Sequence, residues 1–342
     1  MKLDIGRLAP RVLALLLLVE VALRFVPVKH VAYRGWEAAR SSVGGFFLPN
    51  QRYENDRSYG DLANLGNLPA RREYRRDTFT TDGRGYRNPP DLLNGPRPAA
   101  VLLGDSFAAG AGNPDDEMLS AQLTRRLGAP VYNAAGRSTW DLDEWLGVSR
   151  EIGLDRGWVI YEHLQGASPA ARAKKERWRP LSLSPMKIWL SRGMRRIQDG
   201  VVLPNPHLLR VDDLRLRDGT PMLFLPDPGK AEDDADRWRD LLTQRSEELT
   251  RSGLRLLVVL VPTKRQIYGP MLEPPSRSLD AAFDLFARLE NDLRARGVGV
   301  VNLAPVFRRE AESGALLYWR DDTHWNPAGI RLAAEEIARA LR

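Results

Sequence analysis

Two polar motifs, far apart in the sequence, carry the residue types of acyl-transfer chemistry. A Gly-Asp-Ser-Phe motif contains Ser106, and an Asp-Asp-Thr-His motif contains His324. A serine hydroxyl becomes an effective nucleophile when an imidazole accepts its proton, and a carboxylate can hold that imidazole in the required tautomer. Asp321 and Asp322 both have a suitable spacing from the histidine. The sequence therefore predicts Ser106 as the nucleophile and His324 as the general base, oriented by one of the two aspartates.

Each motif taken alone also has a structural interpretation. Ser106 has the residue type of a helix cap, and an Asp-His pair is common in surface turns. Metal ligation by His324 is a further alternative, but the chain has four histidines and no cysteine, and no second ligand cluster accompanies the motif. We therefore expect neither a metal nor another cofactor.

A third motif, Asn133-Ala-Ala-Gly136, follows another short apolar run. Backbone N–H groups of such a loop can stabilise the oxyanion of a tetrahedral intermediate. We expect the amides of Ser106 and of the residues near Gly136 to have this role, and an ordinary turn is the alternative.

Strands and helices must position these motifs, and the sequence indicates them as short apolar runs that alternate with segments of helical apolar periodicity. Strands are predicted over 99–104, 131–133, 158–161, 254–261 and 298–303, and helices over 119–127, 142–154, 279–293 and from Asn326-Pro327 onward. Continuous apolar strands between amphipathic helices indicate a parallel sheet covered on both faces. The predicted fold class is therefore α/β, a three-layer α/β/α flavodoxin-like domain with about five parallel strands. In such sheets the active site forms at the carboxyl ends of the strands, where all three motifs fall.

The chain divides into three predicted parts. Residues 1–28 have a basic start and an apolar run over 12–19, which continues past Glu20 and Arg24. This plan is typical of an export signal, and we expect an uncleaved single-pass membrane helix, with a cleaved signal peptide or a buried soluble helix as alternatives. Residues 29–98 are predicted to form an extracytoplasmic linker and β-rich lead-in, and 99–342 the catalytic domain, with a basic insertion at about 165–235.

The basic character of the chain is concentrated in that insertion. The net charge is +7, yet residues 171–197 contain nine lysines or arginines and only Glu176 as an acid. Trp178 and Trp189 lie in the same stretch, and indole rings stack on sugars while basic groups pair with uronates or lipid phosphates. A solvated face is the alternative. We expect an acidic polysaccharide as partner and, because of the export signal, no nucleic acid.

Together the motifs resemble the SGNH (GDSL-type) hydrolase superfamily. Two further stretches resemble its alginate O-acetyltransferase group: Val261–Tyr268 contains a Pro-x-Lys-x-x-x-Tyr segment, and Tyr318–Trp325 contains an Asp-Thr-His-Trp motif. The resemblance covers about 78–342. It implies Ser106 as the nucleophile, His324 as the base and Asp322, in preference to Asp321, as the orienting acid.

One departure from the superfamily pattern concerns the third strand. An asparagine that donates to the oxyanion is expected after it, but the chain reads Tyr161-Glu-His-Leu-Gln-Gly166 there. Either Glu162, His163 or Gln165 has another role, or two backbone amides suffice.

The resemblance implies O-acetylation of an extracellular or cell-surface polysaccharide through an acyl-Ser106 intermediate. It also implies an inner-membrane protein whose catalytic domain faces the periplasm or cell exterior, with an acetyl donor delivered by a membrane-bound O-acyltransferase. The residues expected to bind substrate are Asn133, Lys264, Tyr268, Arg320 and Trp325; for Lys264 and Tyr268 a solvated loop and a half-buried ring are the alternatives. An SGNH carbohydrate esterase or deacetylase, a lipase-like esterase, and an inactive polysaccharide-binding module remain alternative functions.

Overall fold

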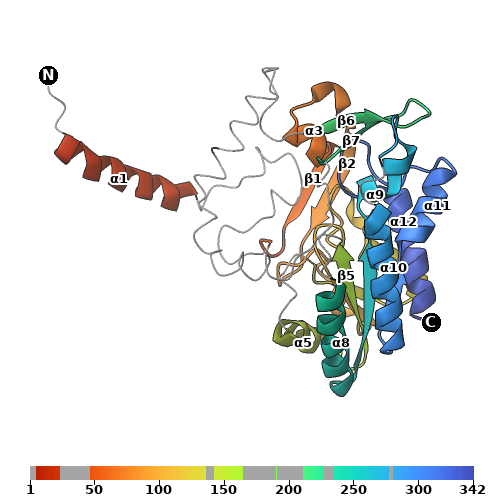
Figure 1. Ribbon diagram of the computed structural model, residues 1–342. Helices are drawn as coiled ribbons and strands as arrows, with labels where there is room; N and C mark the ends of the chain where they lie inside the picture. Colours follow the sequence, from red (N-terminus) through yellow and green to blue (C-terminus); the bar gives the residue numbers. More distant parts are fainter. Residues whose placement is uncertain are drawn as a thin grey trace.

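A five-stranded parallel sheet forms the centre of the molecule (Figure 1). The structure is a computed structural model that describes residues 5–23, 47–135, 142–164, 190, 211–226, 235–276 and 280–342. The strands, in spatial order, are β4 (Val131–Asn133), β3 (Ala100–Leu103), β5 (Gly157–Leu164), β8 (Leu254–Val261) and β9 (Gly299–Asn302). The predicted parallel sheet is thereby confirmed. Because the chain runs from β3 outward to β4 and then back to β5, the strand order reverses beside β3, which is where open α/β sheets bind ligands.

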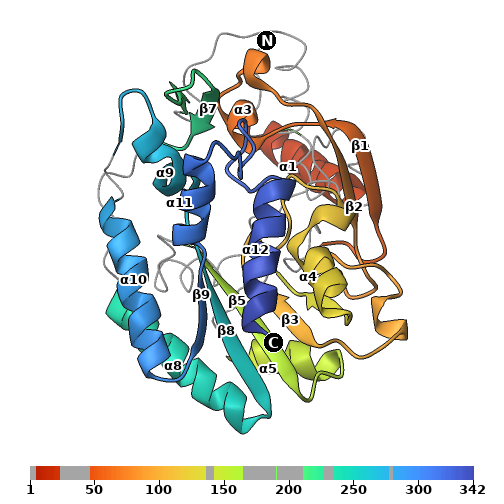
Figure 2. The ribbon, with the colours of Figure 1, turned by 90° about the vertical axis from the view of Figure 1, so that its right-hand side faces the viewer.

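Alternate side chains of each strand enter two separate cores, as a two-sided sheet requires. Ala100 and Leu102 of β3 face one core, and Val101 and Leu103 face the other. The first core is covered by α4 (Leu119–Leu127), α11 (Ala304–Glu312) and α12 (Pro327–Ala340). The second is covered by α5 (Leu142–Glu151), α8 (Ala235–Arg251) and α10 (Asp280–Ala295). The three-layer arrangement predicted from the sequence is confirmed, and Figure 2 looks onto the face that α4 and α12 cover.

The helices next to the candidate site begin and end where the sequence predicts. α4 ends at Gly128, whose φ of 66° lies in the left-handed region that glycine tolerates best. The side chain of Asn326 accepts hydrogen bonds from the backbone N–H groups of Ala328 and Gly329, and Pro327 occupies the first position of α12. This cap fixes the direction in which the chain enters α12 directly after His324.

The lead-in contributes an antiparallel pair, β1 (Arg52–Ser58) and β2 (Arg75–Thr80), and the short helix α3 (Asp61–Leu65). A second antiparallel pair, β6 (Asp212–Arg215) and β7 (Pro221–Phe224), comes from the insertion. Both pieces lie against the loop that precedes α12: the amide of Ala63 donates to Asp321 O at 3.1 Å, and that of Leu223 donates to Arg320 O at 2.9 Å. The remaining short elements are η3 (Pro69–Arg71), η4 (Leu92–Asn94), η5 (Asp115–Glu117), α9 (Lys264–Tyr268) and η7 (Gly269–Met271).

The N-terminal segment forms the helix α1 (Ile5–Ala22). Three ionisable residues, Arg7, Arg11 and Glu20, lie within its 18 residues. Among the helices in the described ranges, none combines the length and apolar character needed to cross a bilayer, so the structure does not support the membrane-spanning helix expected over 1–28. The basic stretch 171–197 with Trp178 and Trp189 lies, apart from Leu190, outside the described residues.

Candidate active site

Ser106, His324 and Asp322 form a continuous hydrogen-bonded chain at the carboxyl edge of the sheet. Ser106 Oγ lies 2.7 Å from His324 Nε2, and His324 Nδ1 lies 2.6 Å from Asp322 Oδ1. With Nδ1–H donating to the carboxylate, Nε2 is left to accept the serine proton. Ser106 is exposed, whereas the other two residues are buried. An exposed hydroxyl is thus hydrogen-bonded to a buried imidazole, which in turn contacts a buried carboxylate.

The two aspartates that the sequence left as alternatives have different partners. Asp322 contacts the imidazole, and its Oδ2 accepts hydrogen bonds from the backbone N–H of Asp61 at 3.0 Å and from Arg75 Nη2 at 3.1 Å. Asp321 faces away from the imidazole, and its carboxylate accepts from Arg75 Nη1 and from the backbone N–H groups of Gly60 and Glu73. Of the two, Asp322 is the one placed to orient His324, whereas Asp321 attaches the loop to the lead-in.

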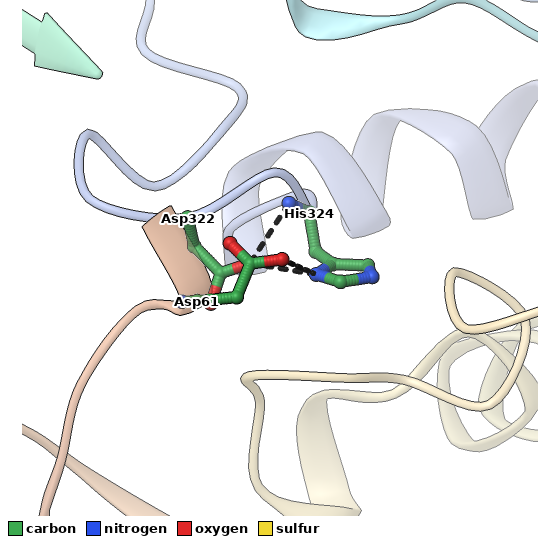
Figure 3. Close-up of side chains that lie close together, drawn as sticks. All are labelled: Asp61, Asp322 and His324. Atoms are coloured by element: carbon green, nitrogen blue, oxygen red, sulfur yellow. Dashed lines mark hydrogen bonds and ion pairs between the residues drawn. The ribbon is translucent and has the colours of Figure 1, made fainter. Parts of the chain in front are cut away.

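The lead-in supplies a second carboxylate beside the histidine (Figure 3). Asp61 Oδ2 lies 3.8 Å from His324 Nδ1, and Asp61 Oδ1 accepts from the backbone N–H of Thr323 at 2.7 Å. Sequence patterns did not indicate Asp61 or Arg75, because no motif marks either residue and their partners lie 262 and 246 positions away along the chain.

The carboxylates of Asp61 and Asp322 and the imidazole of His324 also have the spacing of a metal site, with ligand atoms within 4.8 Å of one another. Each of these groups already takes part in hydrogen bonds of the protein: His324 with Ser106 and Asp322, and Asp61 with Thr323. The imidazole nitrogen that faces both carboxylates is Nδ1, so an ion bound there would replace the hydrogen bond between His324 and Asp322. We therefore assign the cluster to orientation of the histidine.

The turn that carries Ser106 is braced by Glu162 of β5. The Glu162 carboxylate is buried and accepts a hydrogen bond from the backbone N–H of Ala108 at 2.7 Å. It passes so close to Gly104 that a Cβ added there would lie 2.4 Å from Glu162 Oε2, so only glycine fits at this position. Glu162 thus occupies the stretch in which the superfamily pattern expects an asparagine.

The other residues considered for that stretch and for the oxyanion have different placements. His163, next to Glu162, lies in the second core, with its ring centroid 4.3 Å from that of Trp238. Gly136 and Gln165 lie outside the described residues. The expected oxyanion role of the amides of Ser106 and Gly136 stays a prediction.

Three residues expected to bind substrate instead lie in the interior. The side chain of Asn133 donates to Ala108 O and accepts from the amide of Ala135. Tyr268 donates to Ala315 O and accepts from the amide of Leu317, and burial raises the pKa of its hydroxyl to about 12. Trp325 packs edge-on against Phe107, the neighbour of Ser106, with ring centroids 5.0 Å apart. These residues brace the site rather than line a groove, because apolar packing and backbone partners already occupy them.

Lys264 is also buried, beneath the loop that carries Asp322. Its Nζ lies between 2.7 and 3.0 Å from four carbonyl oxygens, those of Leu223, Trp319, Arg320 and Asp322. Burial lowers the pKa of Lys264 to about 7, opposed chiefly by the negative charge of Asp322. The expected contact with substrate is therefore replaced by support of the loop. Arg320 alone among the expected substrate-binding residues remains partly exposed, and it pairs with Glu73.

Comparisons with known proteins agree with the resemblance drawn from the motifs. Residues 222–342 match the family described as SGNH hydrolase-like domain, acetyltransferase AlgX. The chain is 32% identical over 114 residues to the alginate biosynthesis protein AlgX of Pseudomonas aeruginosa, a match that covers 32% of this chain and 23% of AlgX. It is 30% identical over 110 residues to the protein named "Probable alginate O-acetylase AlgJ" of the same organism, covering 31% of this chain and 27% of AlgJ. The matched region thus spans about a quarter of the length of these relatives.

Among solved structures, the acetyl xylan esterase AlAXEase superposes with a TM-score of 0.39 and 11% identity, covering 71% of this chain and all of that chain. A similarity this low supports no conclusion about function. The predicted resemblance to the SGNH superfamily and its alginate O-acetyltransferase group is confirmed by the family match and the curated relatives.

Proposed function

We propose that this chain is a serine-dependent acyltransferase that O-acetylates a polysaccharide through an acyl-Ser106 intermediate. The observation that carries the proposal is the chain of contacts from Ser106 Oγ to His324 Nε2 and from His324 Nδ1 to Asp322, at 2.7 and 2.6 Å. A hydroxyl, an imidazole and a carboxylate in this order form an activated nucleophile whatever the fold that carries them.

The proposed reaction has two half-reactions. Ser106 Oγ attacks the carbonyl carbon of the acetyl donor while His324 Nε2 takes the hydroxyl proton, and the donor's leaving group departs with that proton. A sugar hydroxyl then attacks acetyl-Ser106, His324 takes its proton, and the proton returns to Ser106 Oγ as the bond to serine breaks. Backbone N–H groups of Ser106 and of the loop containing Gly136 would stabilise the oxyanion in both halves.

Transfer to a sugar is favoured over transfer to water by the similarity of residues 222–342 to the AlgX acetyltransferase domain. The names of the relatives refer to alginate biosynthesis and alginate O-acetylation, and on that basis we propose an acidic polysaccharide as the acceptor. The acetyl group would come from a donor presented by a membrane-bound O-acyltransferase.

The proposed place of reaction follows from the N-terminal sequence. The basic start and the apolar run over 12–19 are typical of an export signal. We propose that the chain is exported and held at the inner membrane through residues 1–28, with its catalytic domain in the periplasm. A periplasm-active reporter fused after residue 342 should be active, and a reporter that is active only in the cytoplasm should not be.

Mass spectrometry tests the reaction directly. The full chain treated with p-nitrophenyl acetate should gain one acetyl group on Ser106, and Ser106→Ala and His324→Ala should gain none. Added acidic oligosaccharide should then carry the acetyl group. Release of free acetate with unmodified sugar would indicate an esterase, and absence of the adduct in the wild-type protein would contradict the mechanism.

A further inference from the structure

We propose that Arg75 of β2 is a positioning residue of the catalytic site. It holds the loop that carries Ser106 (residues 104–114, the nucleophile loop) in register with the loop that carries Asp321 and Asp322 (residues 313–326, the acid loop), and it offsets the negative charge behind His324. The proposal rests on the function proposed above. The observation behind the role of Arg75 is that its guanidinium contacts both loops, although Arg75 belongs to the lead-in and precedes the catalytic domain in sequence.

The contacts of Arg75 join three separate segments. Nη1 donates to Asp321 Oδ1 at 2.8 Å and Nη2 to Asp322 Oδ2 at 3.1 Å, which ties β2 to the acid loop. Nε donates at 3.1 Å to the carbonyl of Gly112, which follows Ser106 on the nucleophile loop. A planar guanidinium can make such divergent bonds at once, whereas a lysine ammonium cannot reproduce the fork.

The surroundings fix the guanidinium in this position. The Arg75 side chain is 8% exposed, and the side chains of Asp321 and Asp322 are fully buried. The guanidinium carbon lies 4.2 Å from the centroid of the Trp319 ring, and Nη1 also donates to Glu73 O. Charge-assisted hydrogen bonds between buried groups hold their geometry far better than exposed ion pairs do.

The charge of Arg75 matters for the histidine as well as for the loops. Within the described residues, His324 faces Asp322 on its own loop and Asp61 on α3, with Asp321 behind them. The cations set against these three carboxylates are Arg75 on β2 and Lys264 on α9. Removal of Arg75 increases the excess of negative charge near the imidazole. This favours its protonated form, which cannot accept the serine proton.

The test measures acetylation of Ser106 in the full chain against pH. In Arg75→Met the acidic limb of the plot of rate against pH should shift to higher pH by about one unit, because a fixed positive charge near the base has been lost. The plateau rate should fall roughly 10- to 100-fold, since misplacement of the base is costly. In Arg75→Lys the charge remains, so the limb should stay near its wild-type position while the rate still falls.

Arg87 provides the matched control. Its side chain is 1% exposed and donates to the carbonyls of Ala109 and Gly110 on the nucleophile loop, but its carboxylate partner is Asp115 rather than an aspartate of the acid loop. Arg87→Met should lower the melting temperature without moving the acidic limb. A shift in Arg87→Met equal to that in Arg75→Met would overturn the proposal, as would an unmoved limb and a rate within twofold of wild type in folded Arg75→Met.

Two further measurements keep the outcome decisive. If Arg75→Met does not fold, the comparison of Arg75→Lys with Arg87→Lys replaces it, and equal rates in the two would refute the positioning role. If the wild-type protein forms no acetyl adduct, the proposed function fails. The His324 resonances in NMR titrations of the full chain and Arg75→Lys or Arg75→Met would then test the charge effect without any activity, and superimposable titrations would refute it.

Discussion

At the scale of single residues, the two neighbouring aspartates of the acid loop have different partners. One contacts the proposed base, and the other attaches the loop to the lead-in. Asp322 Oδ1 contacts His324 Nδ1, whereas the carboxylate of Asp321 contacts Gly60, Glu73 and Arg75 of the lead-in. Their side chains are equally buried, so a difference in their effects on catalysis cannot be ascribed to burial. Substitution of each by the isosteric amide therefore distinguishes the two roles.

Asp322→Asn should lower the rate of Ser106 acetylation about 1,000- to 10,000-fold, because an amide N–H facing Nδ1 favours the wrong tautomer. Asp321→Asn should lower it less than about tenfold, but should destabilise the fold by roughly 2–4 kcal/mol, because Arg75 loses a buried charged partner. The measurements are intact-mass time courses with p-nitrophenyl acetate and urea unfolding. A larger catalytic loss in Asp321→Asn than in Asp322→Asn would reverse the assignment.

The sequence could identify the residues of the site that lie in motifs but not those that reach it from elsewhere. Ser106 and His324 were predictable because each follows or precedes a strongly patterned element. Asp61 and Arg75 were not, since their partners Asp322 and Asp321 are separated from them by 261 and 246 positions, and no local pattern encodes such a contact. Lys264 was predicted to bind substrate, because its spacing in the motif does not show whether the side chain lines a surface groove or lies buried beneath a loop.

At the scale of secondary structure, the strands of the parallel sheet and four of the helices were predicted, whereas α8, α9 and α11 were not. The five strands and the helices α4, α5, α10 and α12 are where the apolar patterns indicate. α9 has only five residues and all of them are buried, so it has no exposed face and no period to detect. Its N-terminus is nevertheless well fixed, by a capping box between Thr263 and Gln266.

The burial of α9 makes stability depend on pH through Lys264. Its pKa is about 7 in the folded protein and about 10.4 in an unfolded chain. Between these values the unfolded chain binds more protons, so the free energy of unfolding rises with pH in this window and is unaffected by this group below it. The penalty for burying a charged amine is thus largest at and below pH 7.

Comparison with Lys264→Met isolates this contribution. Relative to the variant, the wild-type protein should gain about 1–3 kcal/mol of unfolding free energy between about pH 7 and about pH 9.5. Urea unfolding at the two pH values measures the difference, with Arg265→Met, on the same helix, as the control that lacks a titrating amine. A difference between wild type and Lys264→Met that stays constant with pH would contradict the prediction.

At the scale of the whole molecule, the catalytic domain depends on two segments that lie outside its predicted pattern of strands and helices, the lead-in and the insertion. Gly60, Asp61 and Arg75 of the lead-in bond the acid loop from one side, and Leu223 of the insertion pairs with Arg320 from another. The alternation of strands and helices predicted the sheet because it is a local property. The docking of these two segments depends on long-range polar contacts, which composition does not reveal.

The N-terminal helix carries most of the large exposed apolar side chains among the described residues. On α1, Leu13, Leu17 and Leu18 are 60%, 59% and 68% exposed. Exposed side chains of this size favour transfer into the interfacial region of a bilayer, by about 0.8 kcal/mol per buried methylene. We therefore expect the full chain to sediment with lipid vesicles and the double variant Leu13→Gln/Leu17→Gln to remain largely in the supernatant. The described contacts of the site come from Ser106, His324, Asp322, Asp61 and Arg75 and not from α1, so acetylation of Ser106 by p-nitrophenyl acetate should be the same in both proteins. Equal sedimentation of the two would show that these leucines do not hold the chain at a membrane, and a loss of acetylation in the variant would show that α1 contributes to the catalytic domain itself.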